Sequence, residues 1–392
     1  MNDTAKTVLC VYATRQIDSN LFMSSTIFRG LKEAGYTVYM IFAGTDSVIS
    51  DFKKIYSKYF DDVFYCRIGD SWLRRVSSKK PLFKLAYSYY RHFIADGYSL
   101  PDLSGVSNFL NNRRFDTILS FIPPILSGRL AIAMRSKMNM GSIPLIQFWT
   151  DPLSLGRCDS IKDIPRSRFI HKYHERKLLS CADKAVFCYP LLCDTERILH
   201  PKYADRMKWS DISYTEHRLM GKDSINTPPL IGFFGAYQSH VRNIRPLLEA
   251  IRELSSYAFI IRGDGDLPFN TDDICNLDIS FGRKSLAEIE ELENKCDILV
   301  SLSGKSGITH PAGKTFYYAS YPKPIIHIGD GANAEYFNQY LKGFGKRFIH
   351  CMNNKEDIIA TIQKTVKTLP EFKLHIPERM DAAVIARKII EE

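Results

Sequence analysis

The sequence predicts an α/β fold with two doubly wound domains, each built on a parallel sheet that carries helices on both faces. Three observations predict it. The chain has 392 residues, more than one hydrophobic core usually accommodates. Short apolar runs alternate with helical patterns, as expected where helices connect parallel strands. A polar, turn-rich stretch over 221–229 ends in two prolines and interrupts this alternation, and the same pattern then starts again.

The first domain is expected over 1–220. Its strands are short apolar runs, and its helices have apolar positions at helical spacing. Gly35 marks the end of one helix, because glycine commonly follows the last helical residue. In chain order we predict a strand over 7–14, a helix over 24–34, strands over 36–42 and 117–122, a helix over 124–137, a strand over 144–148, a helix over 166–181 and a strand over 184–189.

The second domain is expected over 221–376. A capping box at 285–288 opens one of its helices. The expected elements are strands over 230–234, 258–262, 297–302 and 324–328, with helices over 244–254 and 285–295 and another that starts near Ala312. A last helix within 377–392 follows a proline-marked break, and we expect it to cross back to the first domain. The two Rossmann-like domains would then face each other across a cleft.

Composition narrows the class of protein. The chain is 45% hydrophobic and 24% charged, as in ordinary globular proteins. No run approaches the length of a membrane-spanning helix, and the first apolar run is too short for a secretory signal, so we expect a cytoplasmic protein. Nine scattered cysteines without a CxxC pair indicate reduced core thiols and no metal site. The net charge of +10 favours an anionic partner: nucleic acid, a sugar nucleotide or acidic lipid.

The segment 300–320 carries the strongest functional pattern. A buried strand ends at Leu302, a loop rich in Gly and Ser follows, and a helix then starts. Ligands of open parallel sheets bind at the carboxyl ends of strands, where helix N-termini offer free N–H groups to a diphosphate. Lys314 in the first helical turn would add a positive charge. The alternative is a capped helix with a solvated lysine.

A second loop of the same kind follows the strand over 230–234. Gly235 allows a tight turn after this strand, and Arg242 lies near the start of the next helix, with a planar guanidinium suited to phosphate oxygens. Two such loops can converge on one diphosphate. The Walker A pattern is absent, because Gly304-Lys305-Ser306 lacks the upstream glycine, and this argues against ATP hydrolysis.

These motifs resemble a known family. Over about 230–362 the chain looks like the nucleotide-sugar domain of GT-B glycosyltransferases, closest to the family 4 type. The most specific piece is His-Pro-Ala-Gly-Lys-Thr-Phe-Tyr-Tyr-Ala-Ser-Tyr-Pro-Lys-Pro-Ile-Ile, which starts at His310. Gly-Phe-Phe-Gly, Arg-Gly-Asp-Gly, Phe-Gly-Arg and Cys-Asp-Ile-Leu-Val also match, and Glu175 opens a matching stretch in the first half.

The resemblance implies roles for donor binding. Arg242 and Lys314 would neutralise the diphosphate in place of a metal ion, and Arg283, with its two preceding residues, would lie beside the base. Thr309 and His310 would lie near the sugar or the phosphates. Thr315 and Tyr317 complete the implied donor-binding set. The chain departs from the family at Thr309 and Tyr317, where the family usually has a pair of glutamates.

The candidate catalytic residues lie in the first domain. Asp151 follows a buried strand at the expected cleft, where its carboxylate could act as a general base on an acceptor hydroxyl. Equally, Asp before Pro is a common turn former. Asp18 is the second candidate base, and Arg15 could bind an acceptor phosphate. A histidine in the position of His240 is more often a helix-capping or surface residue than part of a binding site.

The segment 72–93 mixes cations with aromatic and aliphatic residues, which is typical of a helix at an anionic membrane surface. The alternative is an ordinary amphipathic helix on the sheet. The membrane interpretation would suit a lipid-linked saccharide acceptor, with the protein peripheral on the inner face of the membrane.

The resemblance therefore implies a metal-independent glycosyltransferase of surface polysaccharide synthesis, which moves sugar from a nucleotide sugar to a saccharide or lipid-linked saccharide. Two alternatives stay open: a sugar-nucleotide epimerase or hydrolase of the same fold, and a non-enzymatic basic protein that binds nucleic acid. The second is disfavoured because no nucleic-acid-binding module is recognisable.

Overall fold

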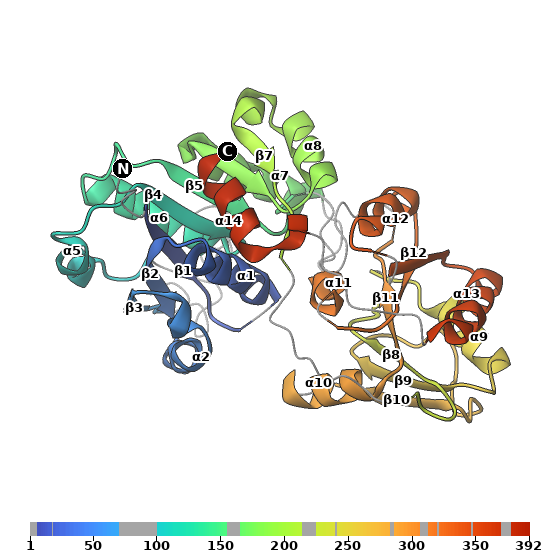
Figure 1. The fold of residues 1–392 in the computed structure, drawn as a ribbon. Helices are drawn as coiled ribbons and strands as arrows, with labels where there is room; N and C mark the ends of the chain where they lie inside the picture. The colour runs from blue at the N-terminus through green and yellow to red at the C-terminus, as the bar shows by residue number, and fades with distance from the viewer. Residues whose placement is uncertain are drawn as a thin grey trace, which may run out of the picture. The chain divides into compact units, whose positions relative to one another are not determined.

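A computed structural model describes most of the chain. The described residues are 6–17, 19–69, 100–154, 165–213, 225–239, 241–282, 286–305, 313–319, 321–345, 348–369 and 378–392. The chain divides into two compact units (Figure 1). The N-terminal unit contains Met1–Arg157 and Asp163–Ser213 together with Asp381–Glu392, and Tyr214–Met380 makes up the main part of the C-terminal unit.

The N-terminal unit is built on a seven-stranded parallel sheet with the order β3-β2-β1-β4-β5-β6-β7. The strands are β1 (Thr7–Ala13), β2 (Thr37–Gly44), β3 (Asp62–Arg67), β4 (Thr117–Ile122), β5 (Leu145–Trp149), β6 (Lys184–Phe187) and β7 (Met207–Trp209). The central strands are mostly apolar and almost entirely buried, because helices cover both faces of the sheet.

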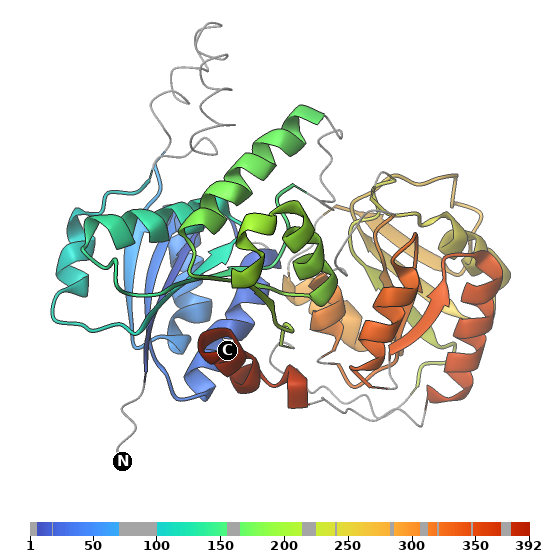
Figure 2. The ribbon, with the colours of Figure 1, turned by 90° about the horizontal axis from the view of Figure 1, so that it is seen from above.

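The helices of this unit lie in two layers (Figures 1 and 2). They are α1 (Ser19–Glu33), α2 (Asp46–Tyr56), α5 (Ser104–Leu110), α6 (Ile125–Lys137), α7 (Pro165–Cys181), α8 (Pro190–Leu199) and α14 (Ala382–Glu391), with short 3-10 turns at Ser57–Tyr59 and Pro201–Arg206. A further 3-10 turn at Glu378–Met380 ends the C-terminal unit. In Figure 2 the helices α6 and α7 lie on one side of the sheet, and α1 and α14 lie on the other.

The C-terminal helix α14 is part of the N-terminal unit. It packs so closely on α1 that a Cβ added to Gly30 would lie 2.1 Å from the carbonyl oxygen of Ala382. The Asp381 side chain caps the helix by accepting from the N–H of Val384, at 3.0 Å. At the other end, the Tyr36 hydroxyl donates to Glu391 at 2.7 Å.

Helix α1 begins at Ser19, five residues before the predicted start at Ser24. Its first turns mix apolar residues with serine and asparagine, and two of their hydroxyls are bonded within the helix: Ser24 donates to the carbonyl of Asn20 and Ser25 to that of Phe22. Such bonds allow serine inside a helix, so the apolar pattern alone marked the start too late.

The C-terminal unit is built on a six-stranded parallel sheet with the order β10-β9-β8-β11-β12-β13. Its strands are β8 (Leu230–Phe234), β9 (Ala258–Gly263), β10 (Leu277–Phe281), β11 (Ile298–Leu302), β12 (Ile325–Gly329) and β13 (Phe348–Met352). Its helices are α9 (Arg245–Glu253), α10 (Leu286–Lys295), α11 (Gly313–Tyr318), α12 (Ala334–Lys342) and α13 (Lys355–Lys367).

The two units share one strand order. In each sheet the chain adds three strands outward in one direction, returns to the centre and continues in the other direction. This is the doubly wound order of Rossmann-like sheets, so the predicted fold class is confirmed. Among the described helices, none combines the length and the apolar composition that crossing a lipid bilayer requires.

Candidate functional site

In the C-terminal sheet the strand order reverses between β8 and β11, which are neighbours at its centre. Parallel sheets of this order bind ligands at such a reversal, beyond the carboxyl ends of the two strands. These ends are Phe234 in β8 and Leu302 in β11. The reversal therefore marks where a ligand of this unit is expected, and both predicted loops start there.

Arg242 bridges the two strand ends. Its Nε donates to the carbonyl oxygen of Leu302 at 2.9 Å, and its Nη1 donates to that of Ala236 at 2.6 Å. The N–H of Lys305 also donates to the carbonyl oxygen of Val241 at 2.8 Å, so the loops after β8 and β11 are bonded through side chain and backbone. The guanidinium is therefore fixed at the reversal point.

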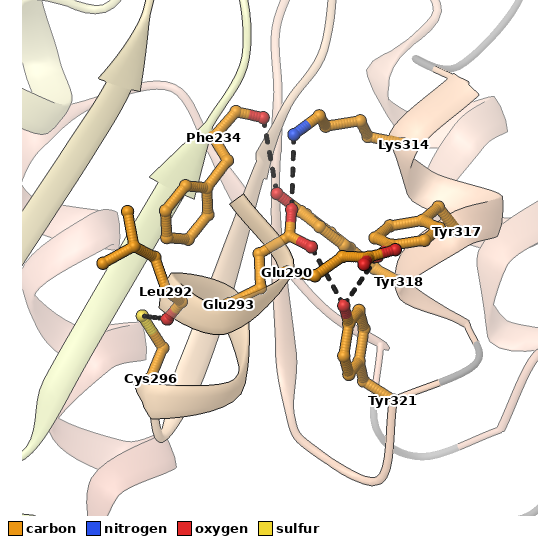
Figure 3. Close-up of polar contacts among 9 residues, drawn as sticks. All are labelled: Phe234, Glu290, Leu292, Glu293, Cys296, Lys314, Tyr317, Tyr318 and Tyr321. Carbon is orange, nitrogen blue, oxygen red and sulfur yellow. Dashed lines mark hydrogen bonds and ion pairs between the residues drawn. The ribbon is translucent and has the colours of Figure 1, made fainter. Parts of the chain in front are cut away.

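Lys314 lies at the same strand end. Its Nζ is 5.7 Å from the centre of the Phe234 ring, 5.9 Å from that of Tyr318, and 3.3 Å from Oε1 of Glu293 (Figure 3). Burial lowers the pKa of Lys314, Glu293 opposes this shift, and the positive charge of Arg242 lowers the pKa further. The structure thus brings the two predicted cations close enough to influence each other.

Helix α11, which carries Lys314, has only six residues. The sequence analysis expected its N-terminus to contribute backbone N–H groups and a helix dipole to a diphosphate. A helix of six residues sums few peptide dipoles, although its first N–H groups are free as in any helix. At this site the positive charge therefore comes mainly from the two side chains.

A buried polar network supports Lys314 (Figure 3). Tyr321 donates to Oε2 of Glu293 at 3.0 Å, its hydroxyl lies 2.7 Å from that of Tyr317, and Tyr317 donates to Oε1 of Glu290 at 3.1 Å. The Glu293 side chain is 0% exposed, and burial raises its pKa, while Lys314 and the tyrosine hydroxyls work in the opposite direction. Both carboxylates come from α10.

The sequence analysis missed Glu290 and Glu293. It noted the absence of glutamates at Thr309 and Tyr317, yet the Tyr317 hydroxyl contacts a carboxylate from a neighbouring helix. The three-residue spacing of Glu290 and Glu293 places both on one face of α10, and that was the available signal. Nothing in the sequence showed that this face packs on α11.

Two other residues predicted to bind the nucleotide-sugar donor, Thr315 and Gly235, lie in the described part of the chain. Thr315 is buried, and its hydroxyl lies 3.0 Å from that of Ser301 in β11, so it packs α11 on the sheet. A Cβ on Gly235 would meet only the Phe233 ring, at 3.7 Å, whereas one on Gly263 would lie 2.0 Å from the Gly235 carbonyl oxygen. The close backbone approach that requires glycine is therefore at Gly263 and not at the turn predicted for Gly235, whose role in donor binding stays a prediction.

Several predicted residues lie outside the described part of the chain. They are Asp18, His240, Arg283, Thr309, His310 and the segment 72–93.

In the N-terminal unit, Arg15 follows β1 and Asp151 follows β5, so both lie at the carboxyl edge of this sheet. The two strands are separated by β4. Asp151 is half-buried, and its charge adds to the burial that raises the pKa of the Cys188 thiol. Their roles in catalysis and acceptor binding stay predictions.

Comparison with known proteins supports the fold. No family model and no curated protein sequence matches the chain. Anabaena HepE, solved with UDP and glucose, is 10% identical with a TM-score of 0.53, over 98% of this chain and 95% of its own. The lipopolysaccharide outer core galactosyltransferase WaaB is 10% identical with a TM-score of 0.53, over 98% and 99% of the two chains. A UDP-N-acetylglucosamine 2-epimerase is 11% identical with a TM-score of 0.50, over 99% and 96%.

These similarities extend over nearly the whole chain, so they concern both units. The chain has the fold of these GT-B proteins, as the sequence resemblance implied.

Proposed function

We propose that the protein is a glycosyltransferase that moves a sugar from a nucleotide-sugar donor to a saccharide or lipid-linked saccharide acceptor. The single observation that carries this proposal is the pair of cations, Arg242 and Lys314, at the carboxyl ends of β8 and β11. Two fixed positive charges at the reversal point of a doubly wound sheet suit a diphosphate. The nucleotide-bound neighbour HepE, solved with UDP and glucose, supports the same interpretation.

In this proposal the diphosphate leaves with its charge neutralised by Arg242 and Lys314, without a metal ion at this site. Lys314 would exchange its contact with Glu293 for one with a phosphate oxygen. Glu293 is buried, and its hydrogen bond from Tyr321 would hold it in place during the exchange. The donor-binding assignments of Arg283, Thr309 and His310 belong to the same proposal, as does Asp151 or Asp18 as the base on the acceptor.

The acceptor assignment rests on composition. The net charge of +10 and the cationic, aromatic segment 72–93 support an anionic, lipid-linked acceptor at the inner face of the membrane. A role in surface polysaccharide synthesis is part of this proposal.

Donor binding can be tested with UDP as the first probe, followed by the other nucleoside diphosphates. Removing Lys314 alone would leave Glu293 buried without its cation, so the comparison uses a Glu293→Gln background. We expect Lys314→Met in this background to weaken binding by about 10–100-fold, the value of one charge-assisted hydrogen bond. Isothermal titration calorimetry measures the change.

The matched control is Lys295→Met. Lys295 is an exposed lysine on α10 that pairs with Glu291 at 2.6 Å, and its removal should leave binding unchanged. Equal dissociation constants with and without Lys314 would contradict the assigned site.

The epimerase neighbour makes a second function testable, because it has the same fold over 99% of this chain. An epimerase or hydrolase needs no acceptor. Incubation with sugar nucleotides alone, analysed by chromatography, should leave the donor unchanged if the protein is a transferase. Conversion of the sugar nucleotide without an acceptor would favour the second function.

A further inference from the structure

The N-terminal unit contains a buried group of three side chains that the proposed function does not use. Glu175 lies on α7, Glu196 on α8, and His200 directly after α8. Their side chains are at most 3% exposed. One potential ligand atom from each lies within 4.8 Å of the others, and no other such group of three is found among the described residues.

The distances within the group suit a metal ion. His200 Nε2 lies 3.2 Å from Glu175 Oε2 and 3.8 Å from Glu196 Oε2. In a tetrahedral site with metal–ligand distances of about 2.0–2.2 Å, neighbouring ligand atoms are about 3.4 Å apart. The observed distances lie on either side of this value. The N–H of His200 also donates to the carbonyl oxygen of Glu196 at 2.8 Å, so the end of α8 holds these two residues close together.

The Glu196 carboxylate is the part of this group for which the described residues supply no hydrogen-bond donor. Neither of its carboxyl oxygens has a hydrogen-bond partner among the described residues, although the residue is only 1% exposed. Glu175 is well bonded: it accepts from the N–H groups of Leu153 and Ser154, each at 2.7 Å, and from the Ser154 hydroxyl at 2.5 Å. A buried carboxylate without donors is costly unless a cation neutralises it.

We propose that Glu175, Glu196 and His200 bind one divalent transition-metal ion, with Zn²⁺ as the best match. Carboxylate oxygens and an imidazole nitrogen are ligands of Zn²⁺, whereas Mg²⁺ prefers oxygen ligands and keeps several waters, which this buried group does not favour. His200 would bind the metal as a neutral imidazole through the lone pair of Nε2, with its proton on Nδ1. The Ser154 hydroxyl or a water molecule would complete the coordination.

Such an ion would fasten α7 and α8 to the loop after β5. Its role would be structural, because it lies in the other unit from Arg242 and Lys314. The proposal is therefore independent of the proposed function. It differs from the prediction of no metal site, which was based on the cysteines and on how the diphosphate is neutralised.

The test uses the full chain, stripped with a chelator and dialysed against micromolar Zn²⁺, Mn²⁺ or Mg²⁺. We expect elemental analysis to give one equivalent of zinc per chain and a raised melting temperature with zinc. Glu196→Gln and His200→Gln should each weaken zinc binding by more than about 100-fold, since even outer partners of metal ligands contribute 10–100-fold. Circular dichroism checks that the variants fold.

Two control variants remove adventitious sites. Cys275→Ser removes an exposed thiol, and His350→Asn removes a histidine from the other unit; both should keep the full equivalent of zinc. Absence of bound zinc from the folded parent protein, or equal zinc binding by Glu196→Gln, would overturn the proposal. A Glu196→Gln variant that is more stable than the parent, with no zinc in either, would show that Glu196 holds a proton instead.

Discussion

The two units use one strand order but fill the reversal point differently. In the N-terminal sheet the point between β1 and β4 is closed by Ser127, a fully buried residue of α6 whose hydroxyl accepts from the N–H of Ala13 at 2.9 Å. In the C-terminal sheet the equivalent point is bridged by the guanidinium of Arg242, with Lys314 beside it. The same topology thus has a buried serine hydroxyl at the reversal point of one unit, with Arg15 two residues beyond β1, and two neighbouring cations in the other.

In the proposed function this difference places the nucleotide diphosphate in the C-terminal unit, while Arg15 keeps its predicted role with an acceptor phosphate. Topology alone would make both reversal points candidates. The side chains distinguish them, because Arg242 and Lys314 lie together at the C-terminal point, and charge-assisted hydrogen bonds to phosphate are the strong ones.

The largest expected effect comes from Arg242→Ala. It removes a cation and leaves the carbonyl oxygens of Leu302 and Ala236 without their donor, so UDP binding should weaken by at least about 100-fold. The free energy of unfolding should fall by about 2–4 kcal/mol, since each unpaired polar group costs 1–3 kcal/mol. Calorimetry and urea denaturation measure the two effects.

The matching change in the N-terminal unit is Ser127→Ala, which leaves the buried N–H of Ala13 unpaired, should cost about 1–3 kcal/mol, and should leave UDP binding unchanged. A large loss of binding in Ser127→Ala would break the comparison between the two reversal points.

The next effect concerns the glycine beside the site. Gly263→Ala would place a Cβ 2.0 Å from the Gly235 carbonyl oxygen, and should reduce the free energy of unfolding by about 2–3 kcal/mol. Gly235→Ala is the control, with an expected cost below about 1 kcal/mol because its Cβ has room. Chemical denaturation of both variants checks the order, and a costlier Gly235→Ala would show that the sequence identified the right glycine.

Lowering the pH should reduce the stability of the C-terminal unit, because folding holds His327 in its neutral form. Burial, aided by the nearby His350, lowers the pKa of His327 to about 3 from its usual 6.5. The unfolded chain therefore binds the proton first, and stability is lost as the pH falls below 6.5, by about 2–3 kcal/mol at pH 4.5.

His327→Leu should remove this loss. Neither ring nitrogen of His327 has a hydrogen-bond partner among the described residues, so leucine should not reduce stability at pH 7. Melting temperatures from pH 7 to pH 4.5 measure the slope. A parent and a variant with the same slope would contradict the assignment.

The smallest expected effect lies in the N-terminal unit. Asp381→Ala removes the cap of α14 and should cost about 1 kcal/mol. Hydrogen exchange should then increase in α14 and in α1, on which it packs, and not in the C-terminal sheet. Faster exchange confined to the C-terminal unit would contradict the assignment of α14 to the N-terminal unit.

Most central strands could be predicted from the sequence, because buried parallel strands are short apolar runs. The run over 230–234, for example, matches β8 at both ends. The edge strand β10 was not predicted: its residues are partly exposed and alternate with polar ones, so it has no continuous apolar run.

The candidate site could be predicted only in part. Arg242 and Lys314 were found because each follows a strand that ends in a glycine-containing loop. Glu293 and Tyr321 could not be found, because their roles depend on how α10 packs against α11. The group of Glu175, Glu196 and His200 was missed for the same reason, since 21 residues separate its first two members in the sequence.

The central claim is that the reversal point between β8 and β11 binds a nucleoside diphosphate. The most direct measurement is hydrogen–deuterium exchange of the full chain with and without saturating UDP. The account predicts protection in the loops 235–242 and 303–305 and in α11, with no change in the loop after β1. Protection confined to the N-terminal unit, or no protection while UDP is bound, would contradict it.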